Sequence, residues 1–234
     1  MLVHAITDHL HTWDRHLPAS SQPHPSTSPI PIFKDSCTVR ERVYVSEQRA
    51  IPLIHHLDND DARSVHFVIY APCPPAEDPQ DPSIPVGTLR LLPYPDTLRP
   101  LPNTHIIAGS PTEEIPPSST FFFQPSPTYR VNPASTLHNG IEPCVRLGRL
   151  AVLKEYRGKG YADLLIQAAL KWAGENPRFS EEALSEEKGK VPEWKGLVCL
   201  YARDVAVRTW ERNGFVVDEG MGVGGRWVLG FWGW

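Results

Sequence analysis

The chain has 234 residues, a formal net charge of −4 and 25 prolines. A chain of this length buries about 70% of its unfolded surface and can hold a well-packed core. No long lysine or arginine cluster occurs, which argues against a nucleic-acid partner, and no apolar run approaches the roughly 20 residues that cross a bilayer. Four widely spaced cysteines, with no Cys-x-x-Cys pair and no secretory signal before them, favour reduced thiols in a soluble cytoplasmic protein.

The N-terminal part of the chain differs in composition from the rest. Residues 5–17 are compatible with a short helix, and the Ser/Thr/Pro-rich residues 18–31 cannot keep regular structure for long. We therefore expect a helix and tether over residues 1–34 and a single domain over residues 35–234. A proline-rich stretch at about 93–143 is expected to be an insertion in that domain, either a loop without chemical function or a substrate lid.

Hydrophobic periodicity predicts strands and helices along the rest of the chain. The first two strands are expected to be antiparallel neighbours, Asp204 is expected to cap the last helix, and the apolar stripe of the longest helix includes Leu164 and Leu165. The expected elements are helices over 35–48, 161–174 and 204–212, and strands over 65–70, 86–92, 145–152, 197–201, 215–217 and 226–231.

A glycine-rich loop follows the expected strand at 145–152 and precedes the longest helix. Gly158 and Gly160 let the backbone approach an anion without a Cβ in the way. The backbone N–H groups at a helix N-terminus, together with the helix dipole, favour a bound phosphate. Because Arg157 and Lys159 add positive charge, the loop predicts a phosphate-binding site.

Two common phosphate loops do not fit this segment. A P-loop needs Ser or Thr after its Gly-Lys pair, and Gly160 follows Lys159 here. Asp163 stands where the Rossmann fingerprint needs its third glycine. Residues 157–162 instead fit the pattern Gln/Arg-x-x-Gly-x-Gly/Ala, and the chain at this point resembles the GNAT superfamily of acyl-CoA N-acyltransferases.

Two further blocks strengthen the resemblance. Residues 206–215 look like the Ala-x-x-x-Tyr-x-x-x-Gly-Phe segment of that superfamily, with Trp210 in place of the tyrosine. Residues 39–48, with Asp58 downstream, are similar to a bacterial branch of the superfamily whose substrates are largely unassigned. The N-terminal tether and the proline-rich insertion lie outside the resemblance.

The resemblance implies an α/β fold with a GNAT-like mixed central β-sheet, a V-shaped splay between two of its strands, and flanking helices. It implies acetyl-CoA as co-substrate, no metal, and direct attack of a primary amine on the thioester in a ternary complex. We expect the acceptor to be a small molecule such as an amino sugar or amino acid. Two alternatives stay open: an amine of a protein or peptide as the acceptor, and a non-catalytic CoA-binding sensor.

The resemblance also implies which residues contact CoA. The backbone at the end of the strand expected over 145–152 should run beside the pantetheine arm and stabilise the oxyanion. Arg203 stands where an Asn or Gln of the superfamily would meet the pantetheine amide. The expected cofactor-binding residues are Leu150, Ala151, Val152, Arg157, Gly158, Lys159, Gly160, Tyr161, Ala162, Arg203 and Trp210.

Catalysis requires a base, because an alkyl amine is mostly protonated at neutral pH. Glu47, Asp58, His66 and Glu142 are candidates, and each also has a structural interpretation, such as an ion pair, a turn cap or a satisfied strand histidine. The indole of Trp210, which replaces the tyrosine of the superfamily, cannot protonate the departing thiolate. Tyr201 or solvent is therefore expected to do so. The expected catalytic residues are Tyr201, Asp58 and Glu142, and the expected substrate-binding residues are Tyr44 and Arg149.

Other partners are predicted from smaller signals. His55 and His56 are adjacent, and neighbouring strand residues point to opposite faces, so no metal site is expected. The aromatic C-terminus from Trp227 to Trp234 favours an interface and hence a possible homodimer. Neither nucleic acid nor a membrane is expected as a partner.

Overall fold

The computed structural model describes residues 2–4, 13–22, 31–72, 83–94, 134–182, 193–221 and 226–231. The chain divides into two compact units. Unit 1 comprises Met1–Arg90, Ala108–Phe123 and Arg149–Leu165, and unit 2 comprises Leu91–Ile107, Gln124–Gly148 and Ile166–Trp234.

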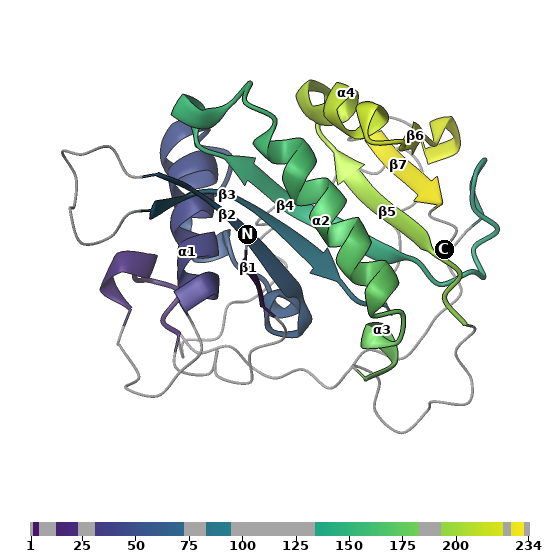
Figure 1. Ribbon diagram of the computed structural model, residues 1–234, viewed down its shortest axis with the longest axis horizontal. Helices are drawn as coiled ribbons and strands as arrows, with labels where there is room; N and C mark the ends of the chain where they lie inside the picture. Colours follow the sequence, from purple (N-terminus) through teal and green to yellow (C-terminus); the bar gives the residue numbers. More distant parts are fainter. Residues whose placement is uncertain are drawn as a thin grey trace. The chain divides into compact units, whose positions relative to one another are not determined.

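The strands form a mixed sheet with the order β1-β2-β3-β4-β5-β7-β6 (Figure 1). β1 is antiparallel to β2, β4 is parallel to β5, and β7 is antiparallel to both β5 and β6. This arrangement confirms the expected α/β class with a mixed sheet. The strands are β1 (Leu2–His4), β2 (Val65–Pro72), β3 (Ser83–Leu92), β4 (Val145–Val152), β5 (Leu197–Ala202), β6 (Val216–Val217) and β7 (Arg226–Phe231).

Helices and short helical turns connect these strands. A π-helical segment, η3, continues directly from the first helix. None of the described helices has the length and apolar character needed to cross a membrane. The helical elements are α1 (Pro31–Arg40), η3 (Glu41–Glu47), α2 (Tyr161–Glu175), α3 (Phe179–Glu182) and α4 (Asp204–Arg212), with the 3-10 turns η2 (Ala19–Ser21), η4 (Leu53–His55), η5 (Asn59–Arg63), η6 (Lys154–Tyr156) and η7 (Glu219–Met221).

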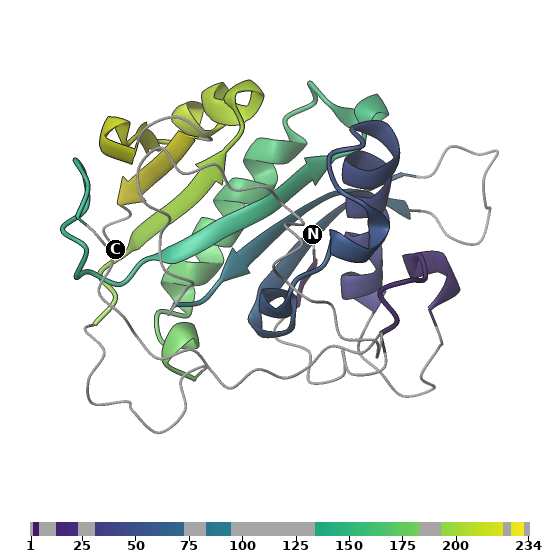
Figure 2. The ribbon, with the colours of Figure 1, turned by 180° about the vertical axis from the view of Figure 1, so that it is seen from behind.

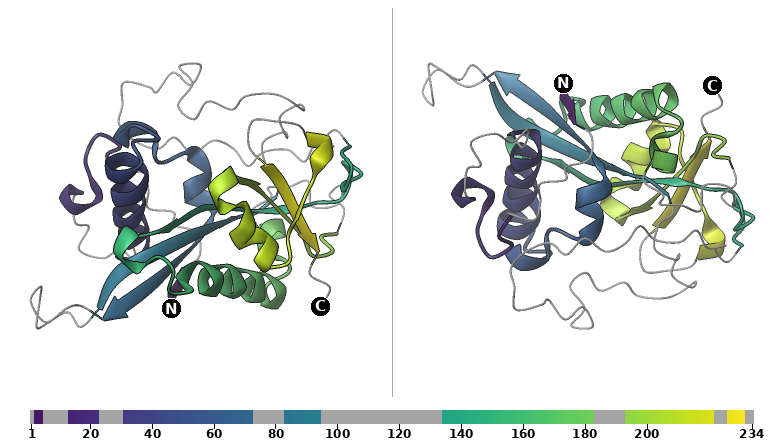
Figure 3. Two further views of the ribbon diagram at one scale, coloured as in Figure 1. Left: turned by 90° about the horizontal axis from the view of Figure 1, so that it is seen from above. Right: turned by 90° about the horizontal axis from the view of Figure 1, so that it is seen from below.

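In unit 1, β3 is covered on both faces. Ser36 Oγ of α1 lies 2.7 Å from Thr88 Oγ1 on one face. On the other face, a Cβ placed on Gly87 would lie 3.1 Å from Leu165 Cδ1, in the first turns of α2. Because successive strand residues point to opposite faces, α1 and the start of α2 lie on opposite sides of β3 (Figure 3). Burial on both sides explains the long apolar run in this strand.

The segment 13–22 packs on α1 in the same unit. The ring of Trp13 meets the ring of Phe33 edge-on, with centroids 5.0 Å apart. The backbone N–H of Ala19 donates to both carboxylate oxygens of Glu41, at 2.9 and 3.1 Å. This part of the expected tether is therefore docked on the helix. The shared buried cluster consists of Trp13, Ala19, Phe33, Cys37 and Leu57.

Unit 2 is organised around β5. Its pairing with β7 extends from Leu197↔Phe231 to Ala202↔Arg226 (Figure 2). Its parallel pairing with β4 extends from Val145↔Val198 to Leu147↔Leu200. The expected splay of these two strands beyond this ladder stays a prediction.

Aromatic side chains fill the core of unit 2. The ring of Phe179 lies edge-on to Trp172 and to Trp194, with centroids 5.2 and 6.4 Å away. The indole N–H of Trp194 donates to the carbonyl of Leu197 (2.7 Å), which satisfies its buried polar atom. These contacts fasten the end of α2 and α3 to the start of β5.

Several expected elements have different bounds or phase. α1 begins at Pro31, four residues before the expected start, because proline needs no N–H partner in the first turn. The expected stripe of α2 was wrong by about one residue, since Leu164 is 50% exposed and Ile166 is fully buried. The prediction that Asp204 caps α4 was also wrong: Arg203 is the N-cap and Asp204 is the first helical residue.

Other expectations concern the ends of the chain. Of the helix expected over 5–17, residues 5–12 lie outside the described residues, and 13–17 form a turn. β1 was not expected. β4 and β7 have the predicted bounds. Residues 232–234 of the aromatic C-terminus, and almost all of the proline-rich insertion, lie outside the described residues.

Candidate functional site

β4 contains a residue in the left-handed backbone conformation. Arg149 has φ of 55°, a conformation that costs a non-glycine residue about 1 kcal/mol or more. Two contacts hold the chain here: Arg149 Nη2 donates to Asp58 Oδ2 (2.7 Å), and the Tyr44 hydroxyl donates to the carbonyl oxygen of Leu150 (2.7 Å). Strain retained by such contacts is typical of functional positions. The structure therefore brings together four of the predicted site residues, in the pairs Arg149–Asp58 and Tyr44–Leu150.

The loop after β4 has the form expected of an anion site. Gly158 and Gly160 have φ of 75° and 81°, and no atom lies within 4 Å of a Cβ placed on either of them. The first backbone bond of α2 is donated by Leu164 to Gly160 (3.1 Å). The amides of Tyr161 and Ala162 therefore belong to the helix start, whose N–H groups are left to caps, water or ligands. The open space over the glycines fits a phosphate group.

The side chain of Arg157 is directed differently from expectation. Its Nε donates to the carbonyl of Val152 (2.9 Å), and its two terminal nitrogens donate to the two carboxylate oxygens of Glu47 (both 2.7 Å). This fork joins the loop to η3, so Arg157 braces the loop on Glu47 rather than reaching toward an anion. The hydrogen bond from Arg157 also lowers the pKa of Glu47, which makes Glu47 a weaker base.

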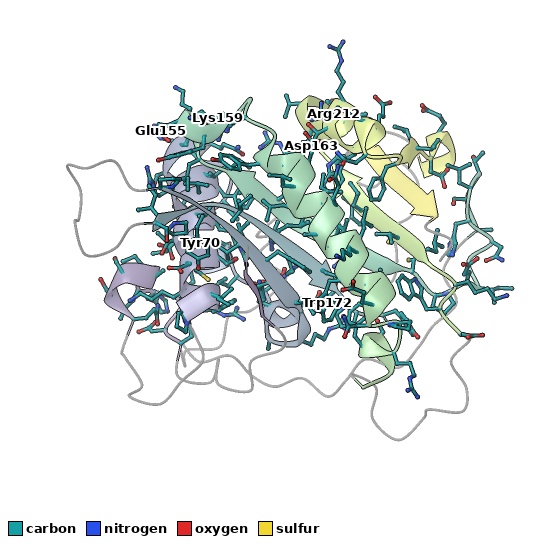
Figure 4. The ribbon with its side chains drawn as sticks, in the orientation of Figure 1. Tyr70, Glu155, Lys159, Asp163, Trp172 and Arg212 are labelled. Atoms are coloured by element: carbon teal, nitrogen blue, oxygen red, sulfur yellow. The ribbon has the colours of Figure 1, made fainter. Side chains whose placement is uncertain are left out.

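The remaining cation of the loop is Lys159. Its Nζ lies 4.9 Å from the centroid of the Tyr156 ring, in a cation–π contact. Figure 4 shows Lys159 and Glu155 along the loop and Asp163 on the first turns of α2. Lys159 is exposed and is the basic side chain of this loop that remains available to a phosphate.

A buried charge network lies behind Arg149 in unit 1. Arg40 donates to both oxygens of Asp61 (2.8 and 3.1 Å). Arg90 donates to Asp61 (2.8 Å) and to Asp58 (2.6 and 3.1 Å), and Arg149 completes the network at Asp58. Three guanidinium groups face two carboxylates, which leaves one positive charge in excess. The side chains of Arg40 and Asp61 are fully buried, whereas those of Asp58 and Arg149 are 31% and 24% exposed.

The network determines the acid–base properties of Asp58. Burial alone would raise the pKa of its carboxyl group, but Arg90 and Arg149 hold that pKa well below its usual range. A carboxylate with a strongly lowered pKa accepts a proton poorly. Asp58 also caps η5 in a reciprocal capping box with Asp61. The geometry thus supports a structural role for Asp58 over its expected role as base.

His56 and His66 are both buried beside this network. Burial lowers the pKa of each imidazole to about 4. His66 Nε2 lies 2.9 Å from the carbonyl oxygen of Asp61, and its ring meets Phe33 edge-on at 4.9 Å. His66 is therefore a neutral core residue at pH 7. Among the described residues, no group of three or more His, Cys, Asp or Glu side chains is arranged to hold a metal ion.

The other predicted residues belong to unit 2. Tyr201 is half-buried on β5 and packs on Leu197 and Cys199. Glu142 accepts a bond at its backbone carbonyl from His138 (2.8 Å), and within the described residues its buried Oε1 has no partner. Trp210 is only 4% exposed and lies edge-on to Phe215, with centroids 5.3 Å apart. Trp210 is thus a core residue, while Arg203 is exposed at the start of α4.

Unit 2 also has an open depression beside α4 and β6. Its volume is about 520 Å³, and none of the predicted site residues lines it. Three carboxylates and one guanidinium group line it. We assign no chemistry to it. Its lining residues are Asp204, Val207, Arg208, Glu211, Val216, Val217 and Glu219.

Comparison with known proteins agrees with this local geometry. The model of the acetyltransferase (GNAT) family matches residues 128–191, which include β4, the glycine loop and α2. The comparison with curated proteins gave no match.

Solved structures with a similar chain trace include three bacterial proteins. A proposed N-acetyltransferase from Lactobacillus plantarum is 20% identical with a TM-score of 0.47, and covers 87% of this chain and 92% of its own. ElaA from Escherichia coli is 16% identical (TM-score 0.43, 87% and 91% covered), and an acyl-CoA N-acyltransferase from Pseudomonas aeruginosa is 14% identical (TM-score 0.43, 87% and 92% covered). The family resemblance thus rests on residues 128–191, which contain the loop between β4 and α2.

Proposed function

We propose that the protein is an N-acetyltransferase that moves an acetyl group from acetyl-CoA to a primary amine of a small molecule. The observation that carries this proposal is the pair of left-handed glycines, Gly158 and Gly160, between β4 and α2. A side chain on either glycine would project into open space, which is the space a pyrophosphate needs in order to reach the backbone N–H groups.

The loop and strand end supply the contacts for the co-substrate. The amides from Gly158 to Ala162 and the ammonium group of Lys159 would hold the pyrophosphate. The backbone of Leu150, Ala151 and Val152 would run beside the pantetheine arm and support the oxyanion. Acetyl-CoA, when bound, supplies an acyl group on a thiol that leaves readily. The protein then contributes mainly orientation and polarisation.

The site favours removal of the amine proton by a group other than Glu47 or Asp58, because arginines lower the pKa of both. Glu142 and Tyr201 keep their proposed roles as base and as acid toward the thiolate, and an ordered water is the alternative for either step. The buried Oε1 of Glu142 supports this choice, since it has no hydrogen-bond partner among the described residues.

The surroundings of Arg149 support an acceptor that carries an anionic or polar group. The network behind Arg149 has one positive charge in excess, and part of the Arg149 side chain reaches solvent. The Tyr44 hydroxyl is engaged with Leu150, so Tyr44 would contact the acceptor through its ring. An amino acid or amino sugar has the required amine and polar groups.

A non-catalytic CoA-binding sensor is the second candidate function. The residue at the superfamily's tyrosine position, Trp210, is buried against Phe215 and has no acidic proton suited to a thiolate. The two functions share the CoA loop and differ only in turnover.

The test combines calorimetry of CoA binding with acceptor-dependent thiol release from acetyl-CoA. Amino sugars, amino acids, polyamines, arylamines and lysine peptides form the acceptor panel. Gly160→Glu places a carboxylate in the anion site, and Lys171→Gln, on the exposed surface of α2, is the matched control.

The proposal predicts thiol release with a small amine, lost in Gly160→Glu and kept in Lys171→Gln. Release with lysine peptides alone would mean that the acceptor is an amine of a protein or peptide and not a small molecule. CoA binding without release on any acceptor would support the sensor, and absence of CoA binding in the wild-type protein would overturn both.

A further inference from the structure

The segment η3 has an unusual helical geometry beside the glycine loop. Gln48 N donates to the carbonyl of Val43 (2.9 Å), a bond that spans five residues, and Ala50 N donates to the carbonyl of Tyr44 (2.8 Å). Arg49 follows with φ of 47°. A π-helical turn is less favourable than an α-turn and occurs frequently at functional sites. The geometry of η3 therefore points to a functional role for its contacts.

η3 is attached to the cofactor side of unit 1 at two points. Tyr44 donates its hydroxyl hydrogen to the carbonyl of Leu150. Glu47 accepts both arms of the Arg157 fork, and Arg157 Nε in turn holds the carbonyl of Val152. Both contacts come from η3, so this one segment holds the end of β4 and the glycine loop.

The contact with Glu47 has the geometry of a positioning device. It is bidentate, and the same guanidinium group is anchored on a backbone carbonyl, so the orientation of Arg157 is fixed by three bonds. Glu47 and Arg157 are 32% and 40% exposed, and an ion pair with this exposure contributes little to global stability. The pair is better suited to fixing the loop than to stabilising the fold.

We propose that Glu47 and Tyr44 are positioning residues of the transferase, a proposal that rests on the function given above. Glu47 acts through Arg157 to hold the pyrophosphate loop in its binding conformation. Tyr44 acts through the Leu150 carbonyl to hold the strand end at which the thioester is polarised. Each residue therefore governs a different step: Glu47 governs the binding of CoA, and Tyr44 governs the rate of transfer.

The chain offers a matched control for Glu47. Arg42 of η3 and Glu155 of η6, just before the glycine loop, form a second ion pair, but it is long (3.9 Å) and the side chains are 54% and 65% exposed. Glu155→Gln removes the same charge from the same region as Glu47→Gln without touching Arg157. Calorimetry with CoA, steady-state kinetics and thermal unfolding are measured for the wild type and each variant.

The expected results separate the two roles. Glu47→Gln raises the Kd for CoA about tenfold, because the released loop must be ordered on binding, while its Tm stays within about 2 °C of the wild type. Glu155→Gln changes neither the Kd for CoA nor the Tm. Tyr44→Phe lowers kcat roughly tenfold to a hundredfold, as misplacement of the reacting groups does, and leaves the Kd for CoA within about twofold.

A double-mutant cycle tests whether Glu47 acts through Arg157. In an Arg157→Gln background, which cannot form the fork, Glu47→Gln should have no further effect on the Kd for CoA. If the effects of Glu47→Gln and Arg157→Gln on the Kd for CoA are additive, Glu47 does not act through Arg157. Equal effects of Glu47→Gln and Glu155→Gln on this Kd would also overturn the proposal. If Tyr44→Phe changes only Tm, its positioning role is wrong. If the wild type itself fails to bind CoA, the proposed function fails, and that result is separate from any difference among variants.

Discussion

Arg40 and Asp61 form a two-bond ion pair, at 2.8 and 3.1 Å, with both side chains fully excluded from solvent. The pair ties α1 to η5, and Asp61 also accepts a bond from Arg90 of β3. Desolvation of such a pair is expensive, so its formation adds little net stability by itself. Removal of one partner, however, leaves a buried charge without compensation.

Asp61→Asn should therefore destabilise the protein strongly. The substitution leaves Arg40 and Arg90 facing a neutral amide in the interior, for which the expected loss is about 3–5 kcal/mol in the free energy of unfolding. Urea denaturation followed by circular dichroism measures it. The control is Lys171→Gln, which removes an exposed pair with Glu175 (3.8 Å) and should change stability by no more than about 0.5 kcal/mol. Similar losses of unfolding free energy in Asp61→Asn and Lys171→Gln would contradict the claim that burial makes the Arg40–Asp61 pair critical.

Stability should fall as the pH falls from about 6.5 to about 4. The pKa of His56 and of His66 is lowered by burial to about 4, whereas an unfolded histidine titrates near 6.5. Between these values the unfolded chain binds more protons than the folded chain, so acidification favours unfolding. The loss is of the order of 3 kcal/mol for each histidine across the whole window.

Urea midpoints at pH 8, 7, 6, 5 and 4.5 check this dependence. The midpoint should be nearly constant from pH 8 to 7 and fall below pH 6.5. Asp58 and Asp61, whose pKa values are lowered by their arginines, add a further loss only below about pH 4, where unfolded carboxylates take up protons. A constant midpoint down to pH 4.5 would show that the two histidines are not buried as neutral groups.

The loop and the central strands could be predicted because their signals are local. β4 precedes the glycine loop, and an amphipathic helix follows that loop. Gly158 and Gly160 were recognisable because a left-handed backbone next to a ligand favours glycine. β1, in contrast, has three residues and exists only through its pairing with β2, and so short a strand carries no periodicity.

The contacts that define the site could not be predicted, because they join residues far apart in sequence. An ion pair was one interpretation of Glu47, but its partner, Arg157, is 110 residues away in the sequence. Nothing in a strand sequence indicates that Arg149 takes a left-handed conformation. Asp58 is a poor base because Arg90 and Arg149 lower its pKa, and His66 is one because it is buried beside Phe33. Only the folded chain brings these residues together.

Gly87→Ala tests the packing of β3 against α2. An added Cβ would lie 2.9 Å from Ile69 Cγ2, 3.1 Å from Leu165 Cδ1 and 3.3 Å from the carbonyl oxygen of Ala151. Overpacking of this kind typically costs about 1–3 kcal/mol. Gly148→Ala is the control, since no atom lies within 4 Å of its Cβ position. Thermal unfolding should show a clear decrease in Tm for the first variant and almost none for the second; the reverse order would refute the close approach at Gly87.

The conformation of Arg149 predicts a reversal of the usual order of alanine and glycine in a strand. Both Arg149→Ala and Arg149→Gly remove the ion pair with Asp58, so the two variants differ only in the backbone cost at φ of 55°. In an ordinary strand, glycine is less stable than alanine by roughly 0.5–1 kcal/mol. At a left-handed position a Cβ costs about 1–2 kcal/mol, so Arg149→Gly should be the more stable variant by about 1 kcal/mol. Urea denaturation of the pair measures the difference directly, and a more stable alanine variant would mean that residue 149 has regular strand geometry.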